Sequence, residues 1–83
     1  MAGSSRFVVE NDSLEALVLN VEPEGAFFPL DRGCKVFVFD AFVIHPVTLK
    51  FSRGEHGESI LSIWPGDGAV RVEKDGVNLL DTL

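Results

Sequence analysis

Residues 59–76 read SILSIWPGDGAVRVEKDG and contain two strand patterns, two turn patterns and the only tryptophan of the chain, Trp64. Pro65-Gly66-Asp67-Gly68 is a dense turn signal between the two strand patterns. Asp75-Gly76 supplies the positive φ values that a tight hairpin needs. We therefore expect these two turns to set the register of the last three strands.

Alternation within this stretch divides the first strand into two faces. Leu61 and Ile63 share one face, whereas Ile60 and Trp64 share the other. If Leu61 and Ile63 face the core, Trp64 faces outward. Outward tryptophans often anchor interfaces. Alternatively, a second layer covers this face as well, or Trp64 closes the end of the sandwich over the following turn, and these interpretations stay open.

Short strand patterns fill the rest of the chain, and turn signals separate them. Pro23 and Gly25 end one segment that a helix could also have formed, and its Leu-x-Leu-x-Val alternation favours a strand. About seven short strands are typical of an antiparallel β-sandwich, with a small β-barrel as the alternative. The remaining expected strands cover residues 7–10, 14–22, 26–30, 35–39, 47–51 and 77–80.

Two of these strands carry specific expectations about their faces. Residues 47–51 alternate most cleanly, which predicts Val47, Leu49 and Phe51 in the core. Residues 35–39 are apolar on both faces. That strand either is covered on both sides, or it directs Phe37 and Phe39 toward something other than the core.

Length and composition limit the class of protein. Eighty-three residues, 46% of them hydrophobic, suit one folded domain rather than a disordered chain. We expect a single domain over residues 1–83, with an ordered core at 6–80 and frayed ends at 1–5 and 81–83.

Charge and cysteine content limit the partners and the compartment. The net charge of −6 argues against nucleic acid and anionic membrane surfaces as partners. A single cysteine, Cys34, cannot form an internal disulfide, which favours a reducing compartment. Without an apolar run long enough for a signal peptide or membrane helix, the sequence predicts a cytoplasmic protein.

The order of the landmarks resembles a group of small, uncharacterised bacterial proteins of similar length. The shared features are Glu22-Pro23-x-Gly25, Leu30-x-x-Gly33 and Trp64-Pro65-Gly66 followed by Asp75-Gly76. The resemblance implies a bacterial source and an all-β fold. It brings no activity and no functional residues.

No motif in the sequence indicates catalysis, a metal or another cofactor. Cys34, His45 and His56 stand singly on different expected loops, whereas metal sites usually show paired ligands at short spacing. The sequence thus predicts a non-enzymatic module that acts by contact with a protein partner or a second copy. Its candidate surface is Phe37, Phe39, Ile60 and Trp64. The alternative is a small-ligand-binding β-barrel or minor enzyme with acidic turn residues, and its candidate site is Glu22, Glu24 and Asp67.

Overall fold

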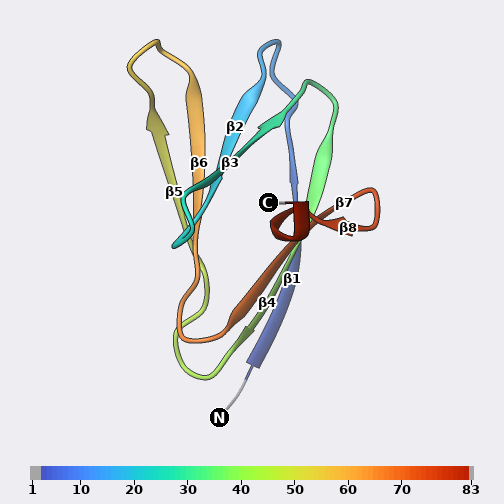
Figure 1. Ribbon diagram of the computed structural model, residues 1–83, viewed down its shortest axis with the longest axis vertical. Coiled ribbons are helices and arrows are strands. Elements are labelled where there is room, and N and C mark those ends of the chain that lie inside the picture. The colour runs from blue at the N-terminus through green and yellow to red at the C-terminus, as the bar shows by residue number, and fades with distance from the viewer. Residues whose placement is uncertain (1–2, 83) are drawn as a thin grey trace.

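The computed structural model describes residues 3–82, which form eight strands and one short 3-10 helix in two four-stranded sheets (Figure 1). The elements are β1 (Gly3–Glu10), β2 (Leu17–Val21), β3 (Ala26–Leu30), β4 (Lys35–Phe42), β5 (Thr48–Arg53), β6 (Ser59–Trp64), β7 (Ala69–Lys74), β8 (Val77–Asn78) and η1 (Leu79–Thr82). Sheet A has the order β1-β4-β7-β8, and sheet B has the order β3-β2-β6-β5. The predicted all-β sandwich is confirmed, and the barrel alternative is wrong because the two sheets do not close on each other.

One pairing departs from the predicted antiparallel arrangement. Strands β2 and β6 run parallel, with Leu19 opposite Leu61 and Val21 opposite Ile63. Strand β2 is also shorter than the predicted strand at residues 14–22, since residues 14–16 lie in the preceding loop. The buried Asn11 side chain holds that loop by donating to the carbonyls of Glu15 and Leu30 at 2.7 and 2.8 Å.

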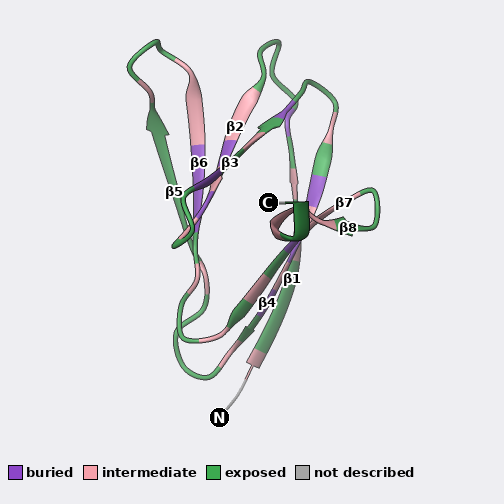
Figure 2. Cartoon of the chain, in the orientation of Figure 1, coloured by how far each residue is buried: buried purple, intermediate pink, exposed green. Residues whose placement is uncertain are grey.

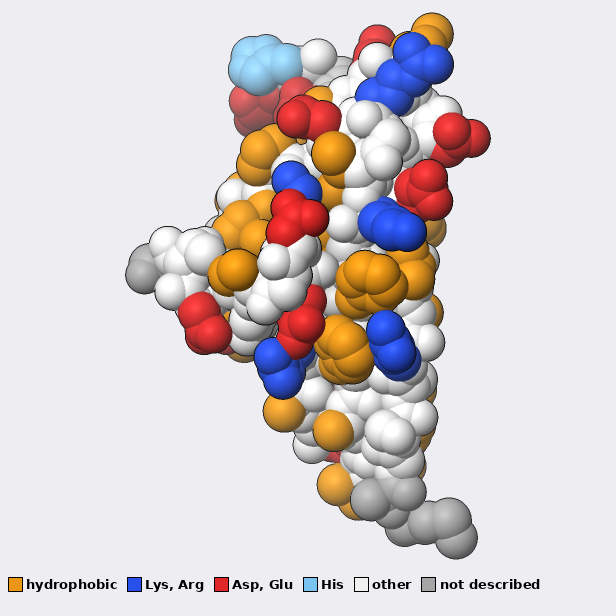
Figure 3. All heavy atoms as spheres, turned by 90° about the vertical axis from the view of Figure 1, so that its right-hand side faces the viewer, with side chains coloured by type: hydrophobic (Ala, Val, Ile, Leu, Met, Phe, Trp, Pro, Cys, Tyr) orange, Lys and Arg blue, Asp and Glu red, His pale blue; other side chains and the backbone are white. Residues whose placement is uncertain are grey.

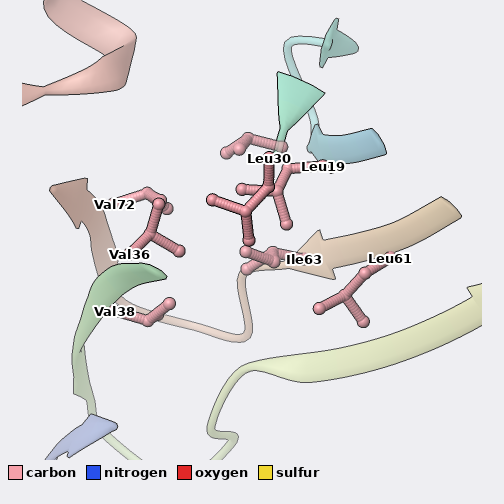
Figure 4. Packing of buried hydrophobic residues seen from close by; sticks show 8 residues of the cluster. Leu19, Leu30, Val36, Val38, Leu61, Ile63 and Val72 are labelled. Carbon is pink, nitrogen blue, oxygen red and sulfur yellow. The ribbon is translucent and has the colours of Figure 1, made fainter. Parts of the chain in front are cut away.

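The core lies between the sheets and consists of aliphatic side chains that alternate along their strands. Figure 4 shows Val36, Val38 and Val72 of sheet A on the side opposite Leu19, Leu30 and Ile63 of sheet B. Each such side chain contributes about 1.5–3 kcal/mol when it is fully buried. The buried cluster comprises Leu19, Val21, Leu30, Val36, Val38, Leu61, Ile63 and Val72.

Strand β4 shows which of the two interpretations of residues 35–39 is correct. Val36 and Val38 are fully buried, whereas Phe37 and Phe39 lie on the outer face of sheet A and are half-buried. The core therefore covers only one face of this strand.

The predicted core face of residues 47–51 is wrong beyond Val47. Leu49 and Phe51 pair with Ile63 and Leu61 and so lie on the inner face of sheet B, yet they are 38% and 78% exposed. Strand β5 is one of the two edge strands of sheet B, and sheet A does not extend over its inner face. All of β5 is coloured as exposed in Figure 2.

The two turns of residues 59–76 play different parts. Asp75 and Gly76 have φ values of 53° and 81° and close the predicted β7–β8 hairpin. Residues 65–68, by contrast, carry the chain from sheet B to sheet A, so β6 and β7 are not paired. The expectation that both turns set the register of the last three strands is therefore wrong for the first turn.

The chain ends also differ from expectation. The predicted last strand at residues 77–80 stops at Asn78, because Leu79 to Thr82 form η1. Gly3, Ser4 and Ser5 are not frayed but pair with β4 as part of β1. The predicted fraying of residues 1, 2 and 83 lies outside the described residues.

Candidate contact surfaces

The four residues predicted as one contact surface belong to two surfaces. Phe37 and Phe39 lie on the outer face of sheet A, whereas Ile60 and Trp64 lie on the outer face of sheet B. The outer faces of a two-layer sandwich point in opposite directions. One flat partner therefore cannot contact all four side chains at once.

The outer face of sheet A is charged, and its cations cover its aromatic rings. The Arg6 guanidinium lies 5.5 and 5.2 Å from the ring centres of Phe37 and Phe39, and Lys35 Nζ lies 5.8 Å from that of Phe37. Figure 3 shows this side of the molecule, with Lys and Arg side chains beside hydrophobic ones. Five of the eleven outward side chains of β1, β4 and β7 are charged; the eleven are Ser4, Arg6, Val8, Glu10, Lys35, Phe37, Phe39, Ala41, Ala69, Arg71 and Glu73.

The outer face of sheet B is nearly free of charge. Phe27 is 62% exposed and Trp64 is 38% exposed, and the Lys50 ammonium lies 5.1 Å from the Trp64 ring centre. Only Lys50 is charged among its ten outward side chains, which are Val18, Asn20, Phe27, Pro29, Thr48, Lys50, Ser52, Ile60, Ser62 and Trp64. Depletion of charge together with aromatic residues is typical of the centre of a protein interface.

Asp67, from the alternative acidic site, already has hydrogen-bond partners in the fold. Its Oδ1 accepts from the backbone N–H of Val43 at 2.8 Å, and its Oδ2 accepts from Ile44 and His45 at 2.8 and 3.0 Å. The hydrogen bonds from this backbone, that of Ile44 foremost, lower the pKa of the Asp67 carboxyl below its usual value. This carboxylate anchors the loop between β4 and β5.

The structure does not bring the other two carboxylates of that site to Asp67. Glu22 and Glu24 line a hollow of about 280 Å³ beside Pro65 and Gly68, and Asp67 is not part of its lining. Among residues 3–82, no three His, Cys, Asp or Glu side chains gather as metal ligands would. Glu22 and Glu24 therefore share a hollow whose lining does not include Asp67.

Asp40 is a buried carboxylate that our sequence analysis did not single out. Its side chain is 1% exposed, Oδ2 accepts from the Val47 N–H at 2.8 Å, and Oδ1 has no partner within the described chain. The signal in the sequence was alternation, because Asp40 continues the inward face of Val36 and Val38. Asp40 anchors the far end of the same loop that Asp67 holds.

Comparison with known proteins adds no relative. No family model, curated protein or solved structure matches this chain. Within the described part of the chain, no helix is long and apolar enough to cross a membrane.

Proposed function

We propose that this protein is a non-enzymatic contact module that self-associates through the outer face of sheet B. The observation that supports this proposal is the single charge among ten outward side chains of that face. In the whole chain, 24% of the residues are charged. A solvated face would be expected to carry charge at a similar frequency, as the outer face of sheet A does.

The charge balance favours a second copy as the partner. The whole chain carries −6 and this face carries +1 from Lys50, so the remaining surface carries −7. Two copies of such an acidic chain repel each other wherever their carboxylates approach. On the outer face of sheet B they can meet without opposing carboxylates, as a two-fold symmetric interface requires.

Three further observations bear on the proposal. Phe37 and Phe39 are not included in the proposed interface, because Arg6 and Lys35 already cover their rings. A ligand site at Glu22, Glu24 and Asp67 has weaker support, since both Asp67 oxygens are engaged. The single free Cys34 supports a reducing, cytoplasm-like compartment as the place of action.

Sedimentation equilibrium over low to high micromolar concentration tests self-association. We expect a concentration-dependent monomer–dimer equilibrium, with Trp64 emission shifting to shorter wavelength as the dimer forms. Phe27→Glu should shift the equilibrium to monomer, because it places a carboxylate within the uncharged face. Leu14→Glu makes a comparable change at an exposed loop residue and should leave association unchanged. A strict monomer over this range would overturn the proposal, and so would equal effects of the two variants.

A further inference from the structure

The outer face of sheet A contains an open hollow of about 450 Å³. It lies on the side of the molecule away from the proposed self-association face. Residues of three neighbouring strands line it, namely Ser4, Arg6, Phe39, Ala41, Ala69 and Arg71. Ser5 and Asp40 complete the lining, but strand alternation directs their side chains to the inner face.

The strand register arranges these residues in two rows. Arg6, Phe39 and Arg71 are direct cross-strand neighbours on β1, β4 and β7. Neighbouring strands lie about 4.8 Å apart, so the two arginines flank the aromatic ring with their Cα atoms about 10 Å apart. The adjacent row consists of Ser4, Ala41 and Ala69. The small side chains of this second row leave open space beside the two cations. We call the surface formed by Ser4, Ala41 and Ala69 the shelf.

The electrostatics of the hollow favour an anion. Within the described chain, Arg6 forms no ion pair, and its guanidinium lies over the Phe37 and Phe39 rings. Arg71 pairs with Glu73, yet a guanidinium has five N–H donors and one carboxylate does not occupy them all. The Asp40 carboxylate lies on the inner side of the sheet and does not face the hollow.

We propose that this hollow binds a small organic oxyanion whose carboxylate or phosphate group contacts Arg6 and Arg71 and whose apolar body rests on Ser4, Ala41 and Ala69. Arginine recognises both carboxylate and phosphate through paired N–H groups, which is why the class includes both. Phe39 lies between the two arginines and keeps the Arg6 guanidinium at the hollow through its contact with the ring. This site is independent of sheet B and of its self-association.

Titration of the full-length chain, followed by amide NMR, tests the site with three probes: benzoate, phenyl phosphate and neutral benzyl alcohol. We expect saturable shifts of the Ala41 and Ala69 amides with at least one of the two anions and none with benzyl alcohol. Whichever anion saturates identifies the charged group. Arg6→Gln and Arg71→Gln should each weaken binding by about tenfold, as expected for loss of a charge-assisted hydrogen bond. Ala69→Leu should block the shelf without changing the charge.

Lys35→Gln provides the matched control. It removes the same charge from the same sheet face, and Lys35 also lies over a phenylalanine ring, but it does not line the hollow. Binding should be unchanged in this variant. The proposal is overturned if neither anion gives saturable shifts, if benzyl alcohol binds equally well, or if Lys35→Gln weakens binding as much as Arg6→Gln. Unfolding of any variant shows in its own amide spectrum, and the other substitutions then decide the outcome.

Discussion

At the scale of single residues, the Asp67 side chain fixes the conformation of the β4–β5 loop through hydrogen bonds. Its carboxylate accepts from three successive backbone N–H groups, although the group itself lies at the surface. Each of those N–H groups would otherwise depend on water, because the loop at residues 43–45 has no strand partner. One side chain thus organises the β4–β5 loop, which carries the chain from sheet A to sheet B.

The lowered pKa of Asp67 predicts a specific dependence of stability on pH. In the unfolded chain this carboxyl has its ordinary pKa of 3.8, and in the folded chain its pKa is lower. A lowered folded pKa means that the stabilising contribution is complete above the unfolded pKa and is lost as pH falls through the folded pKa. When the pH is lowered below about 4, the melting temperature should therefore decrease. Circular dichroism measures this change.

Asp67→Asn isolates this contribution. The variant should melt at a lower temperature at pH 7, and its melting temperature should approach that of the wild type as pH falls below 4. Asp81→Asn, at an exposed position of η1, serves as the control and should follow the wild-type curve. If the melting temperatures of wild type and Asp67→Asn changed with pH in parallel, the Asp67 carboxylate would not be the cause of the acid destabilisation.

At the scale of elements, two of the four segments that connect the sheets within residues 3–82 lie close to each other. The β4–β5 loop leads from sheet A to sheet B, and residues 65–68 lead back. Residues 65–68 pass close to that loop and to the end of β4, since a Cβ atom on Gly66 would overlap the His45 carbonyl and one on Gly68 would overlap the Ala41 carbonyl. Glycine at these two positions permits the backbones to approach each other.

Gly68→Ala should therefore destabilise the fold by about 1–3 kcal/mol, because the added methyl group meets backbone atoms that cannot move aside. Urea unfolding measures the change. Gly54→Ala is the control, since its methyl group meets only the flexible end of the Glu58 side chain. Equal losses of unfolding free energy in both variants would show that the cost comes from replacing any glycine and not from the close backbone contact at Gly68.

Strand β5 allows a second test at this scale. Phe51 and Leu61 are cross-strand partners on the same sheet face, but only Leu61 is buried. Leu61→Ala should cost about 2–5 kcal/mol in free energy of unfolding, as removal of a core leucine does. Phe51→Ala should cost less than about 1 kcal/mol, mostly through strand propensity. A larger loss for Phe51→Ala would mean that its ring is covered in solution.

At the scale of the whole molecule, the two outer faces differ in chemistry. Sheet B presents a nearly uncharged face, and sheet A presents arginines and a lysine around aromatic rings. The first face suits contact between like-charged copies, whereas the second suits an anion. The sandwich thus separates two proposed sites on opposite sides of one core.

Salt should change the two proposed interactions in opposite directions. Between about 0.01 M and 1 M NaCl the Debye length falls from about 30 Å to about 3 Å. Screening reduces repulsion between chains of net charge −6, so the self-association measured by sedimentation should become tighter. The same screening should weaken binding of phenyl phosphate or benzoate at Arg6 and Arg71. If added salt strengthened both interactions, or weakened both, either the self-association face or the anion site would be wrongly assigned.

Periodicity and turn chemistry in the sequence were sufficient for the sandwich class, most strand positions and the Asp75-Gly76 hairpin. These features depend on residues close in sequence, such as the alternation of Val36 and Val38 with Phe37 and Phe39. Alternation also assigned Leu49 and Phe51 correctly to one sheet face. It could not show that no opposing sheet covers that face, because coverage depends on how far a different sheet extends.

The sequence by itself determined an acidic all-β protein with alternating strands and a turn at residues 75–76. Only the tertiary structure decided that residues 65–68 cross between sheets, that Phe39 and Trp64 lie on opposite sides, and that Arg6 and Arg71 flank one ring. The physical reason is that strand order and layer assignment come from long-range pairing. Local backbone preferences and hydrophobic periods are the same for a strand in either sheet.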